Sequence, residues 1–90
     1  MGQLLPVVLE GTATTSGGGT RRPLAIKQKL AYISNDSTSY DLKVNFNKTT
    51  SEDGTFTLKA GEVLSDIPLI CSTVSLEGVG GSVEFRILGV

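Results

Sequence analysis

The chain has 90 residues, of which 39% are hydrophobic and 19% charged, a net charge of −1, one Cys and no His or Trp. A chain of this length forms one domain at most and buries only about 60 to 65% of the surface of its unfolded form, so its core is thin. The scattered Lys and Arg residues argue against a nucleic-acid partner, and no apolar run approaches the roughly 20 residues of a membrane-spanning helix. No metal or other cofactor is expected, because the lone Cys71 and the lack of His leave no zinc-ligand set.

The first twenty residues divide into an apolar strip and a polar linker. Residues 11–20 are almost entirely Gly, Ser and Thr, which predicts a flexible linker before a compact domain at residues 21–90. Residues 1–20 are therefore expected to form an N-terminal arm that docks on its own domain, on a neighbouring copy or on another protein. Its candidate interface residues are Leu4, Leu5, Val7, Val8 and Leu9.

The first part of the domain shows the period of two that is typical of a strand with one buried face. Leu24, Ile26, Leu30 and Tyr32 lie at even positions with Lys27 and Lys29 between them, and they predict one strand over 24–32 in which Gln28 interrupts the apolar set once. Residues 34–39 are Ser, Asn, Asp and Thr, whose side chains bond nearby backbone groups, so they are expected to turn the chain.

The clearest element begins at Tyr40. Apolar and polar residues alternate without interruption from Tyr40 to Asn47, and the alternation resumes at Phe56 after a polar loop that ends in Asp53 and Gly54. The pattern predicts an antiparallel hairpin over residues 40–61 with a long tip.

Three further segments complete the prediction. Residues 62–69 contain Pro68, which cannot donate to a strand ladder, so they are expected to form an edge strand or a connection between sheets. Residues 70–76 form another strand, Gly78 to Gly81 a turn, and a last strand buries Val83, Phe85 and Ile87. The fold class is thus all-β: a small antiparallel β-sandwich, jelly-roll or Ig-like, of about six or seven strands with an N-terminal strand-like arm.

The residue types offer little for catalysis, and the chain is not expected to be an enzyme. Cys71 has no His to activate it, and the acidic residues lie in predicted turns and strand ends without a close pair. Tyr32 and Tyr40 bracket the predicted turn at 34–39 and suggest a platform on which a sugar ring stacks, although packing in the core is the simpler interpretation.

Four segments resemble small virion structural proteins of tailed bacteriophages, in which a β-sandwich carries an Asn-Asp turn, a corner similar to Leu-Lys-Ala-Gly-Glu and a final strand containing Arg. These segments are residues 33–37, 40–46, 56–62 and 85–89. The resemblance implies a head-decoration, head-fibre or tail-associated component of a virion, assembled in the cytoplasm of a host bacterium among other virion proteins. It brings no catalytic motif.

Two functional hypotheses remain at this stage. The first is a noncatalytic structural protein that forms a homo-oligomer, or docks on another virion protein, through its N-terminal strand, since a thin core without disulfides is commonly supplemented by oligomerisation. The alternative is a carbohydrate-binding module that recognises a cell-surface glycan through Tyr32 and Tyr40.

Overall fold

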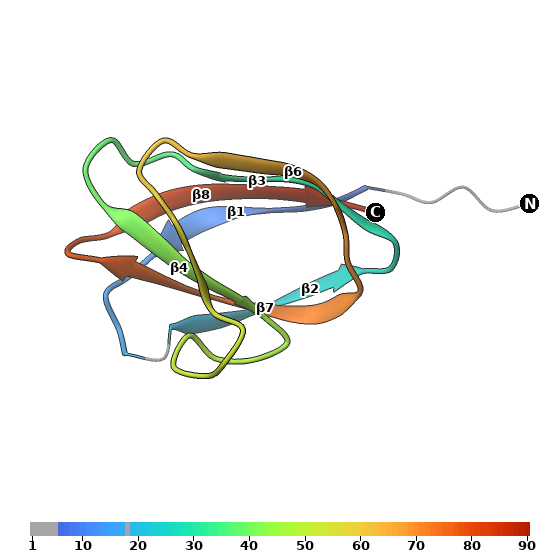
Figure 1. Cartoon of the computed structure of the whole chain (residues 1–90), viewed down its shortest axis with the longest axis horizontal. Coiled ribbons are helices and arrows are strands. Elements are labelled where there is room, and N and C mark those ends of the chain that lie inside the picture. Colours follow the sequence, from blue (N-terminus) through green and yellow to red (C-terminus); the bar gives the residue numbers. More distant parts are fainter. Residues whose placement is uncertain (1–5, 18) are drawn as a thin grey trace, which may run out of the picture.

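The computed structural model describes residues 6–17 and 19–90, and these form two four-stranded sheets packed face to face (Figure 1). Sheet A has the strand order β1-β8-β3-β6, and sheet B the order β2-β7-β4-β5. The strands are β1 (Val7–Ala13), β2 (Thr20–Ile26), β3 (Lys29–Asn35), β4 (Asp41–Phe46), β5 (Phe56–Leu58), β6 (Val63–Pro68), β7 (Cys71–Val79) and β8 (Val83–Gly89).

The predicted all-β sandwich is confirmed, with eight strands among the described residues instead of about six or seven. Every pairing is antiparallel. The chain passes from one sheet to the other at each connection except the one from β4 to β5, which stays within sheet B. An eight-stranded double sheet with this order is a jelly roll.

The core lies between the sheets and follows from alternation along the strands. In β8, Val83, Phe85 and Ile87 are buried while Glu84 and Arg86 are exposed, as predicted. The largest fully buried side chains come from both sheets, so each sheet covers the apolar face of the other. They are Phe85, Leu24, Ile26, Leu30, Ile33, Leu42, Leu58, Leu76, Ile87, Val44, Val74 and Val83.

The predicted hairpin and edge strand are also found. β4 and β5 pair antiparallel, with Leu42 opposite Leu58 and Val44 opposite Phe56. The loop between them lies on the side of sheet B that faces away from sheet A (Figure 1). β6 lies at an edge of sheet A and ends at Pro68, which has no amide proton to donate.

The single strand predicted over residues 24–32 is wrong. The chain turns at Lys27 and Gln28, so β2 ends in sheet B and β3 begins in sheet A. The carbonyl oxygen of Val90 accepts the backbone N–H groups of Lys27, Gln28 and Lys29 at 3.1, 2.8 and 3.1 Å. A residue more than sixty positions away thus organises this turn, and the local alternation does not reveal it.

The linker predicted over residues 11–20 is shorter in the structure. Gly11 to Ala13 continue β1, and Thr20 already belongs to β2. A Cβ atom at Gly11 would lie 3.4 Å from Arg22 Nη1 and 3.6 Å from the Phe85 ring, which are ordinary van der Waals contacts, so pairing with β8 and not crowding places this residue in the strand. Several of the Gly and Thr residues that indicated flexibility therefore belong to strands.

Candidate functional site

The face of sheet A that points away from sheet B is called here the open face. The strand register places side chains from all four strands of the sheet on it, because residues directly opposite one another in a ladder point to the same side. The open face consists of Val8, Glu10, Thr12, Tyr32, Ser34, Val63, Ser65, Glu84, Arg86 and Leu88.

An apolar row crosses the open face. Val8 of β1 lies opposite Leu88 of β8, and Leu88 lies opposite Tyr32 of β3. Val8 is 64% exposed, although it belongs to a regular strand. The row therefore begins at the outer edge of β1 with an apolar side chain that the protein itself leaves largely uncovered.

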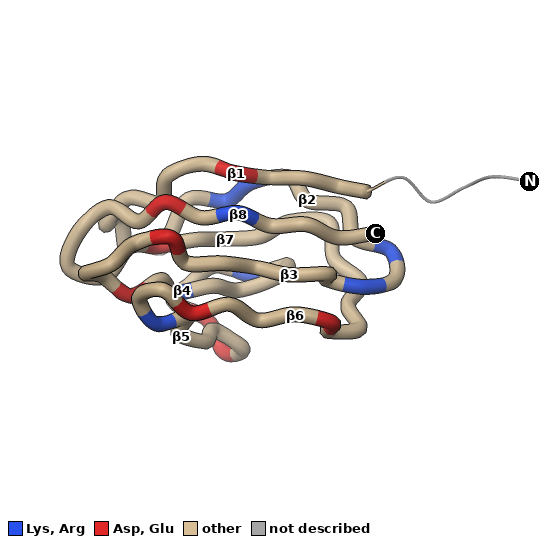
Figure 2. The backbone as a smooth tube through the Cα atoms, turned by 90° about the horizontal axis from the view of Figure 1, so that it is seen from above, with Lys and Arg blue, Asp and Glu red and all other residues tan. Residues whose placement is uncertain are grey.

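A charged row lies beside the apolar one. Glu10 of β1 is opposite Arg86 of β8, and Thr12 is opposite Glu84. Acidic positions on β1, β8 and the end of β3 lie toward the end of the sheet that is farther from the C-terminus (Figure 2). A shallow groove of about 450 Å³ runs over this region and is lined by Glu10, Gly11, Thr12, Asp36, Glu84, Phe85 and Arg86.

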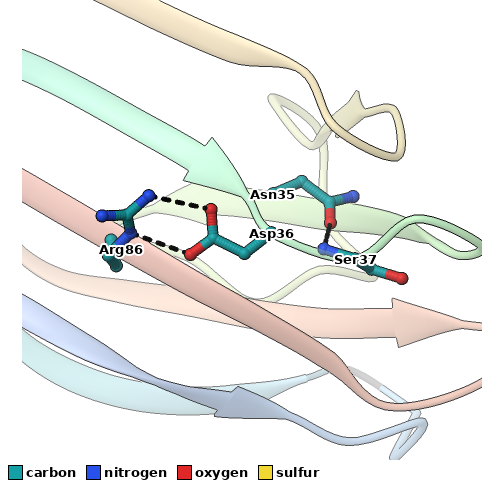
Figure 3. A network of polar contacts seen from close by, with 4 residues as sticks. All are labelled: Asn35, Asp36, Ser37 and Arg86. Carbon is teal, nitrogen blue, oxygen red and sulfur yellow. Dashed lines mark hydrogen bonds and ion pairs between the residues drawn. The ribbon is translucent and has the colours of Figure 1, made fainter.

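An ion pair crosses the groove. Arg86 donates to the Asp36 carboxylate through Nε at 2.9 Å and Nη2 at 3.3 Å (Figure 3). The hydrogen bond from Arg86 lowers the pKa of Asp36 below its ordinary value, against a smaller effect of burial that raises it. Asp36 is thus held as a carboxylate, and the Arg86 charge is already partly satisfied within the chain.

Asn35 fixes the loop that carries Asp36. Its buried amide donates to the carbonyl oxygens of Tyr40 at 2.9 Å and Leu58 at 3.0 Å, and its Oδ1 accepts the N–H of Ser37 at 2.9 Å (Figure 3). The last contact is the Asx turn that the sequence predicted here. Since the bond to Leu58 reaches sheet B, Asn35 ties the end of β3 in one sheet to β5 in the other.

The outer face of sheet B is covered by its own chain. The Asn45 amide donates to the carbonyl oxygens of Thr49 and Asp53 and to Thr55 Oγ1, at 3.0, 3.2 and 3.0 Å. Thr50 Oγ1 donates to Glu77 Oε1 at 2.6 Å. These bonds hold residues 47–55 over β4 and β7, so the two outer faces of the sandwich differ: one is covered by a loop and the other is open.

The structure separates the predicted interface residues. Leu4 and Leu5 lie outside the described residues. Val7 and Leu9 are partly buried and pack against the core, while Val8 points outward. The described part of the strip, from Val7 to Leu9, therefore docks on its own domain as part of the antiparallel partner of β8.

The two candidate sugar-stacking tyrosines lie in different surroundings. Tyr32 belongs to the apolar row of the open face, whereas the Tyr40 ring lies against Gly80 and Gly81 in the turn between β7 and β8. Within residues 6–17 and 19–90, the one pair of aromatic rings close together is Phe46 and Phe56, with centroids 6.2 Å apart. The structure does not join Tyr32 and Tyr40 into one platform.

The described residues contain no group of three or more Cys, Asp or Glu side chains placed to hold a metal ion. None of the described segments is a helix of the length and apolar character needed to cross a membrane. Cys71 is buried, donates to the Leu24 carbonyl oxygen at 3.2 Å, and has its thiol pKa raised by burial. The raised pKa makes it a poor nucleophile.

No protein-family model matches the chain, and a search of curated proteins finds no match. Among solved structures, the chain is similar to the Drosophila NLP core, whose crystal structure is described as giving insight into pentamer formation and histone binding. The two share 20% identity over 92% of this chain and 95% of that chain, with a TM-score of 0.47. So distant a likeness transfers no function.

The expectation of a phage virion component is corrected: none of the comparisons finds a phage protein. The matched structure is that of a Drosophila protein described in terms of histone binding, and not of a phage particle or of a glycan-binding module. The sequence segments that suggested a virion protein are strand and turn patterns shared by many β-sandwiches. Fold patterns of this kind do not specify function.

Proposed function

We propose that this protein is a noncatalytic assembly module that associates with further copies of itself through the side of the sandwich formed by the open face and β1. The observation that carries the proposal is the difference between the two outer faces. Residues 47–55 cover sheet B, whereas no loop of the described residues lies over sheet A, which presents the row of Val8, Leu88 and Tyr32 (Figure 2).

The small size of the domain supports self-association. A chain of 90 residues buries a smaller fraction of its surface than a larger domain does, and Cys71 is the only cysteine, so no disulfide supplements the core. A partner subunit that binds the folded form but not the unfolded form stabilises the folded form by mass action. Burial of Val8 and its neighbours is the contribution that the open face offers.

The chemistry of the chain supports a noncatalytic role. There is no His, and the single thiol is buried with a raised pKa. The Asp36 carboxylate is engaged in an ion pair with Arg86, which holds it in the ionised form.

Sedimentation velocity over a range from micromolar to millimolar concentration tests the proposal. The native chain is expected to sediment as an oligomer at the upper end of this range. Leu88→Lys places a charge in the middle of the apolar row and is expected to shift association to at least tenfold higher concentration.

Thr57→Lys is the matched control, because Thr57 is an exposed residue of β5 on the other sheet. It is expected to leave association unchanged. A native chain that remains monomeric at millimolar concentration contradicts the proposal, and so does equal weakening by both variants.

A further inference from the structure

The loop that covers sheet B contains an aspartate followed directly by a glycine. The chain has seven Asp and Asn residues, and Asp53 alone has Gly as its next residue. The side-chain carbonyl carbon of Asp or Asn and the backbone nitrogen of the next residue can close a five-membered ring, a succinimide. A side chain on the next residue hinders this closure, and glycine has none.

Both groups needed for ring closure are unengaged at this position. Asp53 and Gly54 are exposed to solvent. No residue of the described ranges donates a hydrogen bond to the Asp53 carboxylate or accepts one from the Gly54 N–H. Gly54 has a φ of 93°, which glycine adopts without strain. The attacking nitrogen and the carboxyl group are therefore not held by other parts of the fold.

The other six Asp and Asn side chains are each held by at least one hydrogen bond. They are Asn35, Asp36, Asp41, Asn45, Asn47 and Asp66. The next residue adds a restraint at Asp41, Asn45 and Asp66, because it is a bulky residue within a strand. The structure thus distinguishes Asp53 from every other Asp and Asn residue of the chain.

We infer that Asp53 and Gly54 form a site of spontaneous isomerisation, at which the backbone is rerouted through the Asp53 side chain. The Gly54 nitrogen attacks Cγ of the protonated carboxyl group, the N–Cγ bond forms, and the hydroxyl leaves with the proton of the nitrogen as water. Water then adds to the original Asp53 carbonyl carbon and breaks its bond to the Gly54 nitrogen. The product is isoaspartate of unchanged mass, and water is the only other reactant.

Isomerisation changes the contact that holds this end of the loop. The buried Asn45 amide donates to the Asp53 carbonyl oxygen at 3.2 Å and to the Thr49 carbonyl oxygen at 3.0 Å. In the product, the Asp53 oxygen belongs to a carboxylate outside the main chain, and the main chain is longer by one methylene. The loop over sheet B (Figure 1) is therefore expected to loosen. This inference concerns the covered face and does not depend on the proposed self-association.

Prolonged incubation of the native chain at neutral pH and physiological temperature tests the site. Isoaspartate is expected to accumulate at position 53, where electron-transfer fragmentation of proteolytic peptides distinguishes it from aspartate of equal mass. Asp53→Glu is the matched control, because it keeps the charge at this exposed position but would have to close a six-membered ring. No isomerised product is expected from it.

Asp53→Asn and Asp66→Asn form a pair that separates the effect of the glycine from that of exposure. Both positions are exposed. Ammonia leaves in place of water when the side chain is an amide, so mass spectrometry follows the conversion of amide to acid. Asp53→Asn is expected to react at least tenfold faster than Asp66→Asn, because Asp66 is followed by the β-branched Ile67, which is paired with Leu30 in a strand ladder.

Hydrogen exchange measures the consequence for the loop. The Thr49 N–H donates to Glu52 Oε2 at 2.9 Å, and the Glu52 N–H donates to the Thr49 carbonyl oxygen at 3.2 Å. Both amide protons are expected to exchange at least tenfold faster in the isomerised chain, while those of β1 and β8 keep their protection. Aged Asp53→Glu controls for other effects of incubation and should exchange as fresh protein does.

Each possible failure contradicts a stated part of the inference. An aged native chain without isoaspartate at position 53, or with equal amounts at any other Asp residue, overturns the site. Equal reaction rates of Asp53→Asn and Asp66→Asn overturn the selection by glycine. Unchanged exchange of Thr49 and Glu52 in the isomerised chain overturns the effect on the loop. None of these results bears on self-association, which sedimentation tests separately.

Discussion

At the scale of single residues, Asp36 and Arg86 join two strand regions that are fifty positions apart in the chain. Arg86 contacts the carboxylate through two nitrogen atoms, a geometry that favours the ionised acid. Because Arg86 remains largely exposed, water and salt screen part of this interaction. The pair therefore affects the pH dependence of stability more clearly than the total stability.

We expect the native chain to lose stability relative to Asp36→Asn as the pH falls. The pKa of Asp36 is lowered in the folded state, so its contribution is fully present above the ordinary Asp pKa of about 3.9 and is lost as the pH falls through the folded-state value. Urea unfolding between neutral and strongly acidic pH measures the difference in unfolding free energy between the two proteins, which should shrink toward acid.

Asp66→Asn is the control for this measurement. It makes the same chemical change at an exposed carboxylate that has one contact, to Lys29 Nζ at 3.3 Å. It is expected to cost less stability at neutral pH than Asp36→Asn. A difference between native chain and Asp36→Asn that stays constant down to the lowest pH contradicts the role given to the ion pair.

At the scale of elements, the loop between β1 and β2 meets the loop that covers sheet B. Gly19 has a φ of 79°, and a Cβ atom there would lie 2.9 Å from Thr50 Oγ1 and 3.1 Å from the Leu76 carbonyl oxygen. A side chain at this position has to adopt a left-handed conformation and also displace Thr50. The crossing between the sheets thus depends on one particular glycine.

Gly19→Ala is expected to lower the free energy of unfolding by about 1 to 3 kcal/mol because of the strained backbone and the contact with Thr50. Gly17→Ala in the same loop is the matched control, since no atom lies within 4 Å of a Cβ placed there. Its effect should be neutral or slightly stabilising. Denaturant unfolding of both variants is the measurement, and equal losses would show that the position of the glycine does not matter.

Strand identity was predictable from the sequence where a strand has one dry face and one wet face. The alternation identifies the buried residues of β8 correctly, and in β4 it identifies Leu42 and Val44. It is wrong at Tyr40, which is 41% exposed and lies outside β4, and at Asn45, which is buried. β1 was only partly predictable, because Gly11 is a weak strand former in isolation and is held in the strand by its pairing with Phe85 of β8, a residue far away in the sequence.

The open face was less predictable than the strands. The alternation indicates that Val7 and Val8 point to opposite sides of β1, but which one is covered depends on the sheet that β1 joins. The pairing of Asp36 with Arg86 and the turn held by Val90 depend on contacts between distant parts of the chain. Local sequence patterns carry no information about such contacts.

At the scale of the whole molecule, the first and last strands pair with each other along their full length. β1 supplies Val7 and Leu9 to the periphery of the core and Ala13 to its interior. A domain of this kind forms its longest-range pairing only after much of the chain has been ordered, which makes folding slow, on the order of milliseconds to seconds.

A chain that begins at Thr14 and lacks β1 is expected to lose its cooperative unfolding transition. Removing Val7, Leu9 and Ala13 exposes the flank of Phe85. Full burial of a Val or Leu side chain contributes about 1.5 to 3 kcal/mol, so even the partial burial of these residues is a sizeable part of a total stability of about 5 to 15 kcal/mol. Circular dichroism during heating is the measurement.

A synthetic peptide covering residues 6–13, added in excess, should restore the transition, because the missing strand can pair with β8 from outside. The same peptide with Leu9→Asp is the control and should not restore it, since Leu9 packs against the core. A shortened chain that unfolds cooperatively without the peptide, at the same midpoint temperature as the full chain, would contradict this account of β1.

The separate settings of the two tyrosines give the protein a pair of built-in optical reporters. With no tryptophan to mask them, ultraviolet emission comes from Tyr32 on the open face and Tyr40 over the glycine turn. Replacing either by Phe isolates the signal of the other. Quenching by acrylamide can then distinguish shielding of the sheet surface from loosening of the turn, without any attached dye.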